Sequence, residues 1–174
     1  MEIRVLAEAD LAAYKALRDH ALSHHEEAFT SDAATEAMRT AQSYSARLGL
    51  GGEPDGTGDG SYTLGARRND RLVGSITCER DPRIKVRHIG HIVGMMVFSD
   101  DQGQGVGRAL LKALIDRAHA DAELHLLTLS VTGSNARAVR LYERAGFIRY
   151  GALPRAIRIA GRFFDKQLMQ LTLR

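Results

Sequence analysis

The residues best placed to do chemistry form a glycine-rich segment behind an apolar run. Gly103, Gly105 and Gly107 alternate with other residues, directly after the strand-like run 91–98 and directly before an amphipathic run. Glycines let the backbone approach a ligand without a Cβ in the way, and the free N–H groups of a first helical turn favour an anion. We therefore predict a phosphate or pyrophosphate site, to which Arg108 can add a charge-assisted contact.

Two common phosphate-binding patterns do not fit this segment. A Walker A loop needs a Gly-Lys-Ser/Thr end, and neither a lysine nor a hydroxyl stands at those places. A dinucleotide fingerprint needs a last glycine or alanine, but that position falls on Arg108 when counted from Gly103 and on Leu110 when counted from Gly105. A turn that merely links strand and helix is the remaining alternative, although closely spaced glycines cost stability without a need for close approach.

Alternating strands and helices surround this loop. We expect strands at 3–6, 62–66, 72–78, 88–98, 124–131 and 163–173, and one interrupted strand formed by 147–150 and 157–160. We expect helices at 7–22, 34–48, 105–120 and 135–145. The glycines from Gly49 to Gly60 predict a flexible loop, Pro154 interrupts the first closing strand, and Gly161 fits a hairpin turn. The order βααβββαβαββ predicts an α/β fold, with a mixed central sheet and helices on both faces, in a single domain over 1–174.

Bulk properties narrow the class of protein. The 174 residues fit one domain, 44% hydrophobic content can fill a core, and the net charge of +3 favours an anionic ligand only weakly. Aromatic residues are only 6% of the chain and do not interleave with a basic stripe, which disfavours nucleic acid. Cys78 is the only cysteine in the sequence, which excludes an internal disulfide and a cysteine metal knuckle. Without an apolar span or a signal-like start, we expect no membrane contact and a cytoplasmic location.

Two motifs resemble a known family. Gln102-x-x-Gly105-x-Gly107 resembles the Gln/Arg-x-x-Gly-x-Gly/Ala signature of the GNAT superfamily of N-acetyltransferases. The segment from Asn135 to Phe147 is similar to the family's downstream pattern, Asn-x-x-Ala-x-x-Leu-Tyr-x-x-x-Gly-Phe. The expected element order also fits the GNAT fold, so the resemblance covers essentially the whole chain.

The resemblance implies transfer of an acetyl group from acetyl-CoA, without a metal, to a primary amine by direct attack in a ternary complex. The amine would belong to a small molecule, an amino acid, or a protein N-terminus or lysine. In the family the glycine loop binds the cofactor's pyrophosphate, the preceding strand pairs with its pantetheine arm, and an N–H near Val97 polarises the thioester carbonyl. The cofactor contacts implied are Met95, Met96, Val97, Gln102, Gly103, Gln104, Gly105, Val106, Gly107, Arg108, Asn135 and Ala138.

The resemblance also assigns proton transfer in part. Tyr142 takes the place of the family's general acid, which protonates the departing thiolate. The general base stays open, because some relatives have a glutamate where this chain has Ser130, and a serine is a poor base. Glu79, His88 and His91 are the candidates, although each could be an ordinary paired polar group and a water chain could replace any of them.

The acceptor is not specified by these motifs. Arg83, Lys85 and Arg87 could attract an acidic acceptor or form a solvated basic loop. The polar run 24–27 follows the first helix, borders the acceptor site in many family members, and is expected to be solvated here. The rival function is a non-catalytic sensor that binds acyl-CoA through the same fold, and a homodimer is possible.

Overall fold

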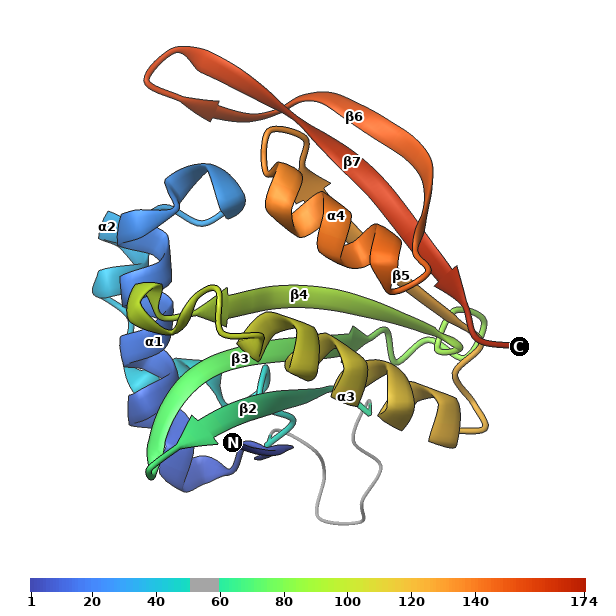
Figure 1. The fold of residues 1–174 in the computed structure, drawn as a ribbon, viewed down its shortest axis with the longest axis horizontal. Helices are drawn as coiled ribbons and strands as arrows, with labels where there is room; N and C mark the ends of the chain where they lie inside the picture. The colour runs from blue at the N-terminus through green and yellow to red at the C-terminus, as the bar shows by residue number, and fades with distance from the viewer. Residues whose placement is uncertain (51–59) are drawn as a thin grey trace.

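The computed structural model describes residues 1–50 and 60–174, and it places one seven-stranded sheet at the centre (Figure 1). The strands lie in the order β1-β2-β3-β4-β5-β7-β6. Their bounds are β1 Glu2–Val5, β2 Tyr62–Arg68, β3 Arg71–Arg80, β4 Ile89–Val97, β5 Leu126–Thr132, β6 Ile148–Ile159 and β7 Arg162–Thr172. The helices are α1 Leu11–His24, α2 Ala33–Ala37, α3 Val106–Ala120 and α4 Ala136–Arg144. The predicted α/β class and element order are confirmed.

The centre of the sheet is where β4 and β5 part. They pair in parallel from Ile89–Leu126 only as far as Ile92–Leu129, whereas the other pairs are antiparallel. Just beyond this point the β3–β4 register shifts, and Gly94 has a φ of +57°, in the left-handed region that favours glycine. This bulge turns the end of β4 away from β5.

Two apolar clusters cover the two faces of the sheet. Under α3 and α4, Leu110, Leu114 and Leu127 are fully buried and form one cluster. Under α1, Tyr14 and Leu17 are equally buried and pack near Met96 of β4. The helices therefore pack against both faces of the sheet, as predicted from the sequence.

The prediction of a second helix over 34–48 is wrong beyond the first turn. Instead of continuing over 34–48, α2 ends at Ala37, a 3₁₀ turn follows at Ala41–Tyr44, and Met38 is 88% exposed. The cause is a buried charge cluster. The Glu36 carboxylate accepts hydrogen bonds from Arg18 Nε of α1 at 2.5 Å and from the Tyr44 hydroxyl at 2.8 Å.

That cluster fixes the segment after α1 against the body of the protein. Burial opposes the charge of Glu36, but the hydrogen bonds from Arg18 and Tyr44 outweigh it and hold the pKa of Glu36 below its ordinary value. A carboxylate that stays ionised and paired keeps the chain folded back on α1 rather than extended as a longer helix.

Smaller corrections concern the ends of the chain. The first helix begins with a 3₁₀ turn at Glu8–Asp10, and α1 itself runs on to His24. In β6 the strand continues through Pro154 with a register shift between Leu153 and Ile157, because an edge strand tolerates the missing N–H.

The loop expected over Gly49 to Gly60 lies largely outside the described residues. In the described part of the chain, no helix is long and apolar enough to span a membrane.

Candidate functional site

A cleft of about 1210 Å³ opens where β4 and β5 diverge. Its walls come from the end of β4, the glycine loop and the starts of α3 and α4, and the segment that follows α1 closes one side. Eleven of the predicted cofactor residues line it: Met95, Met96, Val97, Gln102, Gly103, Gly105, Val106, Gly107, Arg108, Asn135 and Ala138. Sequence reasoning thus brought together residues from three separate elements at one cavity.

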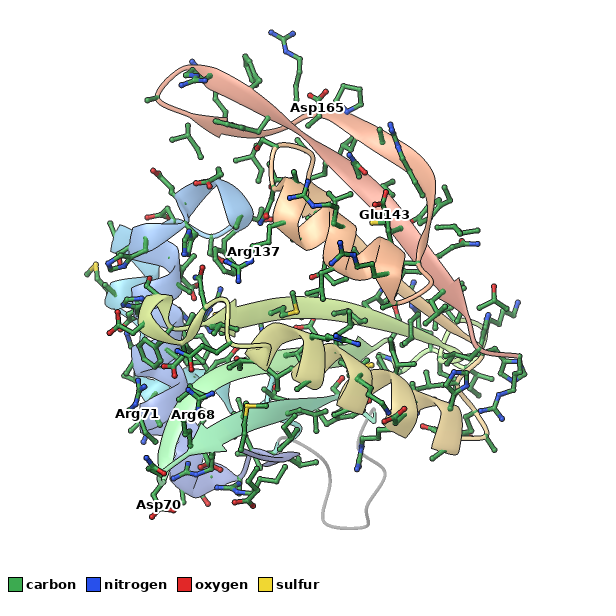
Figure 2. The ribbon with its side chains drawn as sticks, viewed as in Figure 1. Arg68, Asp70, Arg71, Arg137, Glu143 and Asp165 are labelled. Carbon is green, nitrogen blue, oxygen red and sulfur yellow. The ribbon has the colours of Figure 1, made fainter. Side chains whose placement is uncertain are left out.

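Gln104, the remaining predicted contact, does not line the cleft. Its amide nitrogen donates to the Asp100 carbonyl at 2.8 Å, and its amide oxygen accepts from Arg68 Nη1 at 2.5 Å. Nearby, the buried Asp101 carboxylate pairs with Arg68 at 3.1 Å and with Arg71 at 2.6 Å. These two arginines lie together at the β2–β3 turn (Figure 2), so this end of the loop is anchored to that hairpin.

The glycine loop has a backbone shape that needs glycine at two places. Gly103 and Gly105 have φ values of +79° and +81°, and Gly105 is the N-cap of α3. A Cβ at either position would meet nothing within 4 Å, because both face open space. The first N–H groups of α3 have no acceptor inside their own helix, which makes this loop a suitable cradle for a phosphate.

Gln102 joins three walls of the cleft. Its amide nitrogen lies 3.1 Å from His25 Nε2 and 3.4 Å from the Val97 carbonyl, and its amide oxygen accepts from Arg137 Nη1 at 3.3 Å. Arg137 lies between α4 and the segment that follows α1 (Figure 2). The predicted family glutamine therefore ties the segment after α1, β4 and α4 together at one point.

The start of α4 lies opposite the glycine loop. Asn135 caps this helix by accepting a hydrogen bond from the Ala138 N–H at 3.1 Å, which fixes both predicted residues on the cleft wall. Five cations line the same cavity: Arg108, Lys112, Arg137, Arg140 and Arg144. The lining also includes two acids, Glu27 and the paired Asp101, so the wall as a whole favours an anionic ligand.

Tyr142 is buried behind the cleft rather than on its wall. It is 7% exposed, and its hydroxyl donates to Met95 Sδ at 3.9 Å. Met95 does line the cleft, so its side chain separates the phenol from the cavity. Burial raises the pKa of Tyr142, which keeps the phenol protonated and able to donate.

The three base candidates lie at different places. Gly90 faces the core beside Cys78 and Leu127, so the adjacent His91 points to the opposite face of the sheet. There His91 Nδ1 lies 2.6 Å from Thr128 Oγ1, beside Glu79 in the β3–β4 register.

The other two candidates have structural partners. Glu79 forms an ion pair with Arg47 at 3.2 Å. His88 precedes β4, and its ring packs edge-on against His125 with centroids 6.2 Å apart. None of the three candidates lines the cleft itself.

Sequence reasoning missed the contribution of the segment after α1. His25, Glu27 and Phe29 line the cleft, although the run 24–27 was expected to be solvated. The nearby Phe29 is consistent with this placement, since an aromatic residue in a polar loop indicates an anchor point. The predicted basic loop is largely neutralised, because Arg83 pairs with Asp81 and Arg87 with a glutamate, both at 2.5 Å.

Neither a metal nor a nucleophilic cysteine is indicated. In residues 1–50 and 60–174, no group of three or more histidine, cysteine or acidic side chains is arranged to hold a metal ion. Cys78 is fully buried, and burial raises the pKa of its thiol to about 11. A thiol with so high a pKa is almost wholly protonated at neutral pH, which disfavours a covalent acyl relay through Cys78.

Comparisons with known proteins agree with this geometry. A model of the "Acetyltransferase (GNAT) family" matches residues 18–147. The L-methionine sulfoximine/L-methionine sulfone acetyltransferase of Pseudomonas aeruginosa is 39% identical over 77 residues, 44% of each protein. The Salmonella typhimurium enzyme of that name is 30% identical over 99% of this chain and 95% of its own length.

A solved structure extends the likeness to the whole fold. A putative acetyltransferase from Salmonella typhimurium with its cofactor acetyl-CoA superimposes with a TM-score of 0.79 at 25% identity. The match covers 100% of this chain and 94% of that one. By contrast, the Pseudomonas aeruginosa relative is matched over less than half its length. With most of its length matched by the family model and nearly all of it by one relative, this chain belongs to the GNAT family of acetyltransferases.

Proposed function

We propose that this protein transfers an acetyl group from acetyl-CoA to the primary amine of a small acceptor. The observation that carries this proposal is the cleft, where a phosphate-cradling loop, a free strand edge and five cations share one cavity. These three features suit a ligand in which an extended arm joins a thioester to a pyrophosphate. The arm fits the strand edge, and the pyrophosphate fits the loop and the cations. The relative solved with acetyl-CoA supports the choice of cofactor, and the two relatives named for L-methionine derivatives support an amino-acid-like acceptor.

The parting of β4 and β5 prepares the cofactor site. Because parallel pairing ends at Ile92, the edge of β4 from Met95 to Val97 has no strand beside it on the β5 side. Backbone amides of a pantetheine arm can occupy that edge as a strand would. The pyrophosphate then reaches the first turn of α3, and an N–H near Val97 is positioned to donate to the thioester carbonyl oxygen.

In the proposed reaction, the acceptor amine loses a proton and attacks the thioester carbon. The tetrahedral intermediate collapses, its C–S bond breaks, and the thiolate takes a proton from the Tyr142 hydroxyl. The resulting phenolate regains a proton from solvent as coenzyme A leaves. Met95 stands between this hydroxyl and the cleft, so its flexible side chain must turn aside when the cofactor enters. Products are the acetylated amine and free coenzyme A.

His91 is the base candidate that the geometry favours. It lies on the face opposite α3, close to the point where β4 and β5 part, and Thr128 orients its ring. Glu79 is occupied by Arg47, and His88 lies before the strand begins. We expect His91→Gln to lower kcat/KM about 10²-fold or more, the usual contribution of a general base. Unchanged kcat/KM across the pH range would assign proton removal to water.

The function is tested by incubating the protein with acetyl-CoA and a panel of primary amines that includes amino acids. We expect release of free thiol together with an acceptor that gains one acetyl group, followed by mass spectrometry. Tight coenzyme A binding with no turnover on any amine would instead identify a non-catalytic acyl-CoA sensor.

The role of the loop is tested by a matched pair of glycine substitutions. Gly105 and Gly161 both have a φ of +81° and open space at Cβ, but Gly161 lies in the β6–β7 turn. Gly105→Ala and Gly161→Ala should each lower the free energy of unfolding by about 1 kcal/mol, the cost of left-handed backbone for alanine. Only Gly105→Ala should also raise the Kd for coenzyme A, about tenfold or more, because its Cβ meets the pyrophosphate. Calorimetric titration and thermal unfolding measure the two effects, and equal coenzyme A affinity in both variants would contradict the assignment.

Tyr142→Phe tests the general acid. The change keeps the ring in its contact with Phe147, at 5.9 Å between centroids, and removes only the hydroxyl. We expect kcat to fall about 10- to 100-fold, while the KM for acetyl-CoA changes little. The raised pKa of Tyr142 keeps the acid form present up to at least pH 10, so its ionisation should cause no loss of kcat below that pH. Tyr150→Phe, at a tyrosine 54% exposed on β6, is the control, and equal kcat in the two variants would remove Tyr142 from the mechanism.

A further inference from the structure

A lysine near the acceptor side of the sheet has no acidic partner in the described part of the chain. Lys166 lies on β7, and its ammonium donates to the Thr30 hydroxyl at 2.8 Å. Arg47, Arg83 and Arg87 each pair with a carboxylate, whereas Arg162, four residues before Lys166 on β7, packs over the Phe164 ring. Burial lowers the pKa of Lys166, which means that its charge is partly removed from water without a counter-charge.

The strand register places Lys166 beside the end of β5. Lys166 lies directly opposite Thr132 of β5, and Leu168 lies opposite Ser130. Directly opposed residues point to the same face, so the lysine shares its face with Thr132 and Ser130. Ser130 is the first residue of β5 beyond the last β4–β5 pair. From strand spacing, the Cα atoms of Lys166 and Ser130 are roughly 8 Å apart, which a lysine side chain can span.

The segment that follows α1 completes this corner. The Thr132 hydroxyl donates to the Glu27 carbonyl at 2.6 Å, and the Lys166 ammonium reaches Thr30 a few residues later. Glu27 and Phe29 of this segment line the cleft. The uncompensated ammonium is therefore held at the border where the cleft meets the open face of the sheet.

We propose that the Lys166 ammonium binds the carboxylate of the acceptor, which makes the acceptor an α-amino acid rather than a simple amine. This inference rests on the proposed N-acetyltransferase function. An α-amino acid carries its carboxylate only a few ångströms from the amine that attacks the thioester. A partly desolvated cation gains more from such an anion than an exposed one does, and the hydrogen bond between them is charge-assisted.

A structural role for Lys166 makes a different prediction. If the lysine served only to pin Thr30, its loss would impair every acceptor equally, and Thr30→Val would have the same effect. Carboxylate binding instead impairs only acceptors that carry the carboxylate. The comparison of two acceptors that differ in that one group separates the two roles.

The experiment measures kcat and KM for L-methionine sulfone and for 3-(methylsulfonyl)propylamine, which is the same molecule without the carboxylate. We expect wild type to prefer the amino acid. Lys166→Met should lower kcat/KM for the amino acid about 10- to 100-fold, mainly through KM, and leave the amine within about twofold. Lys166→Arg should recover part of the loss. Thr30→Val and Lys85→Met, the latter at an exposed lysine of the β3–β4 connection, should keep the wild-type preference.

Each other result is decisive. Equal losses for both acceptors in Lys166→Met, reproduced by Thr30→Val, would reduce the lysine to a structural contact. Loss of amino-acid preference in Lys85→Met would move the carboxylate site to the β3–β4 connection. A wild-type enzyme that acetylates simple amines as well as amino acids would overturn the inference and leave the N-acetyltransferase function intact. Only a wild-type protein that acetylates nothing in the panel would overturn the function itself.

Discussion

The separation of β4 from β5 is the constraint on which the rest of the structure depends. Two parallel strands that stayed paired would saturate each other's backbone groups and leave no space between α3 and α4. The bulge at Gly94, with its positive φ, ends the pairing at Ile92–Leu129. From there one strand leads into the glycine loop and the other into the Asn135 cap, so the N-termini of α3 and α4 border one cavity. The partial positive charges of both termini then favour an anion in that cavity.

The two sides of this opening have different chemistry. On the face covered by α3 and α4, five cations and the glycine loop suit a ligand that carries several negative charges. On the opposite face, β4 presents the imidazole of His91, β5 the hydroxyl of Thr128 and β7 the amide of Gln170. These three residues lie side by side in the strand register. A surface of that kind suits a small polar molecule better than a polyanion. The proposed cofactor and acceptor thus approach the same gap from opposite faces, as a ternary complex requires.

Local features could be predicted from the sequence, and distant contacts could not. The glycine loop and the Asn135 cap are fixed by a few adjacent residues, so spacing alone located them. The early end of α2 depends on contacts between Arg18, Glu36 and Tyr44, which come from separate segments. No periodicity within 34–48 reveals that the Glu36 carboxylate points inward. The position of Tyr142 behind Met95 also depends on a contact across 47 sequence positions, which helical spacing does not encode.

The burial of Tyr142 decides which proton transfer it can perform. A phenol surrounded by apolar groups is held neutral, because the phenolate would be desolvated without a compensating charge. It therefore cannot take a proton from an ammonium ion, and in the proposed reaction it gives one to the departing thiolate. That step forms a desolvated phenolate, which must regain a proton as coenzyme A leaves. The proton that the amine loses must then leave on the polar face, where His91 and Thr128 lie. The two proposed proton transfers are thus assigned to opposite faces of the sheet.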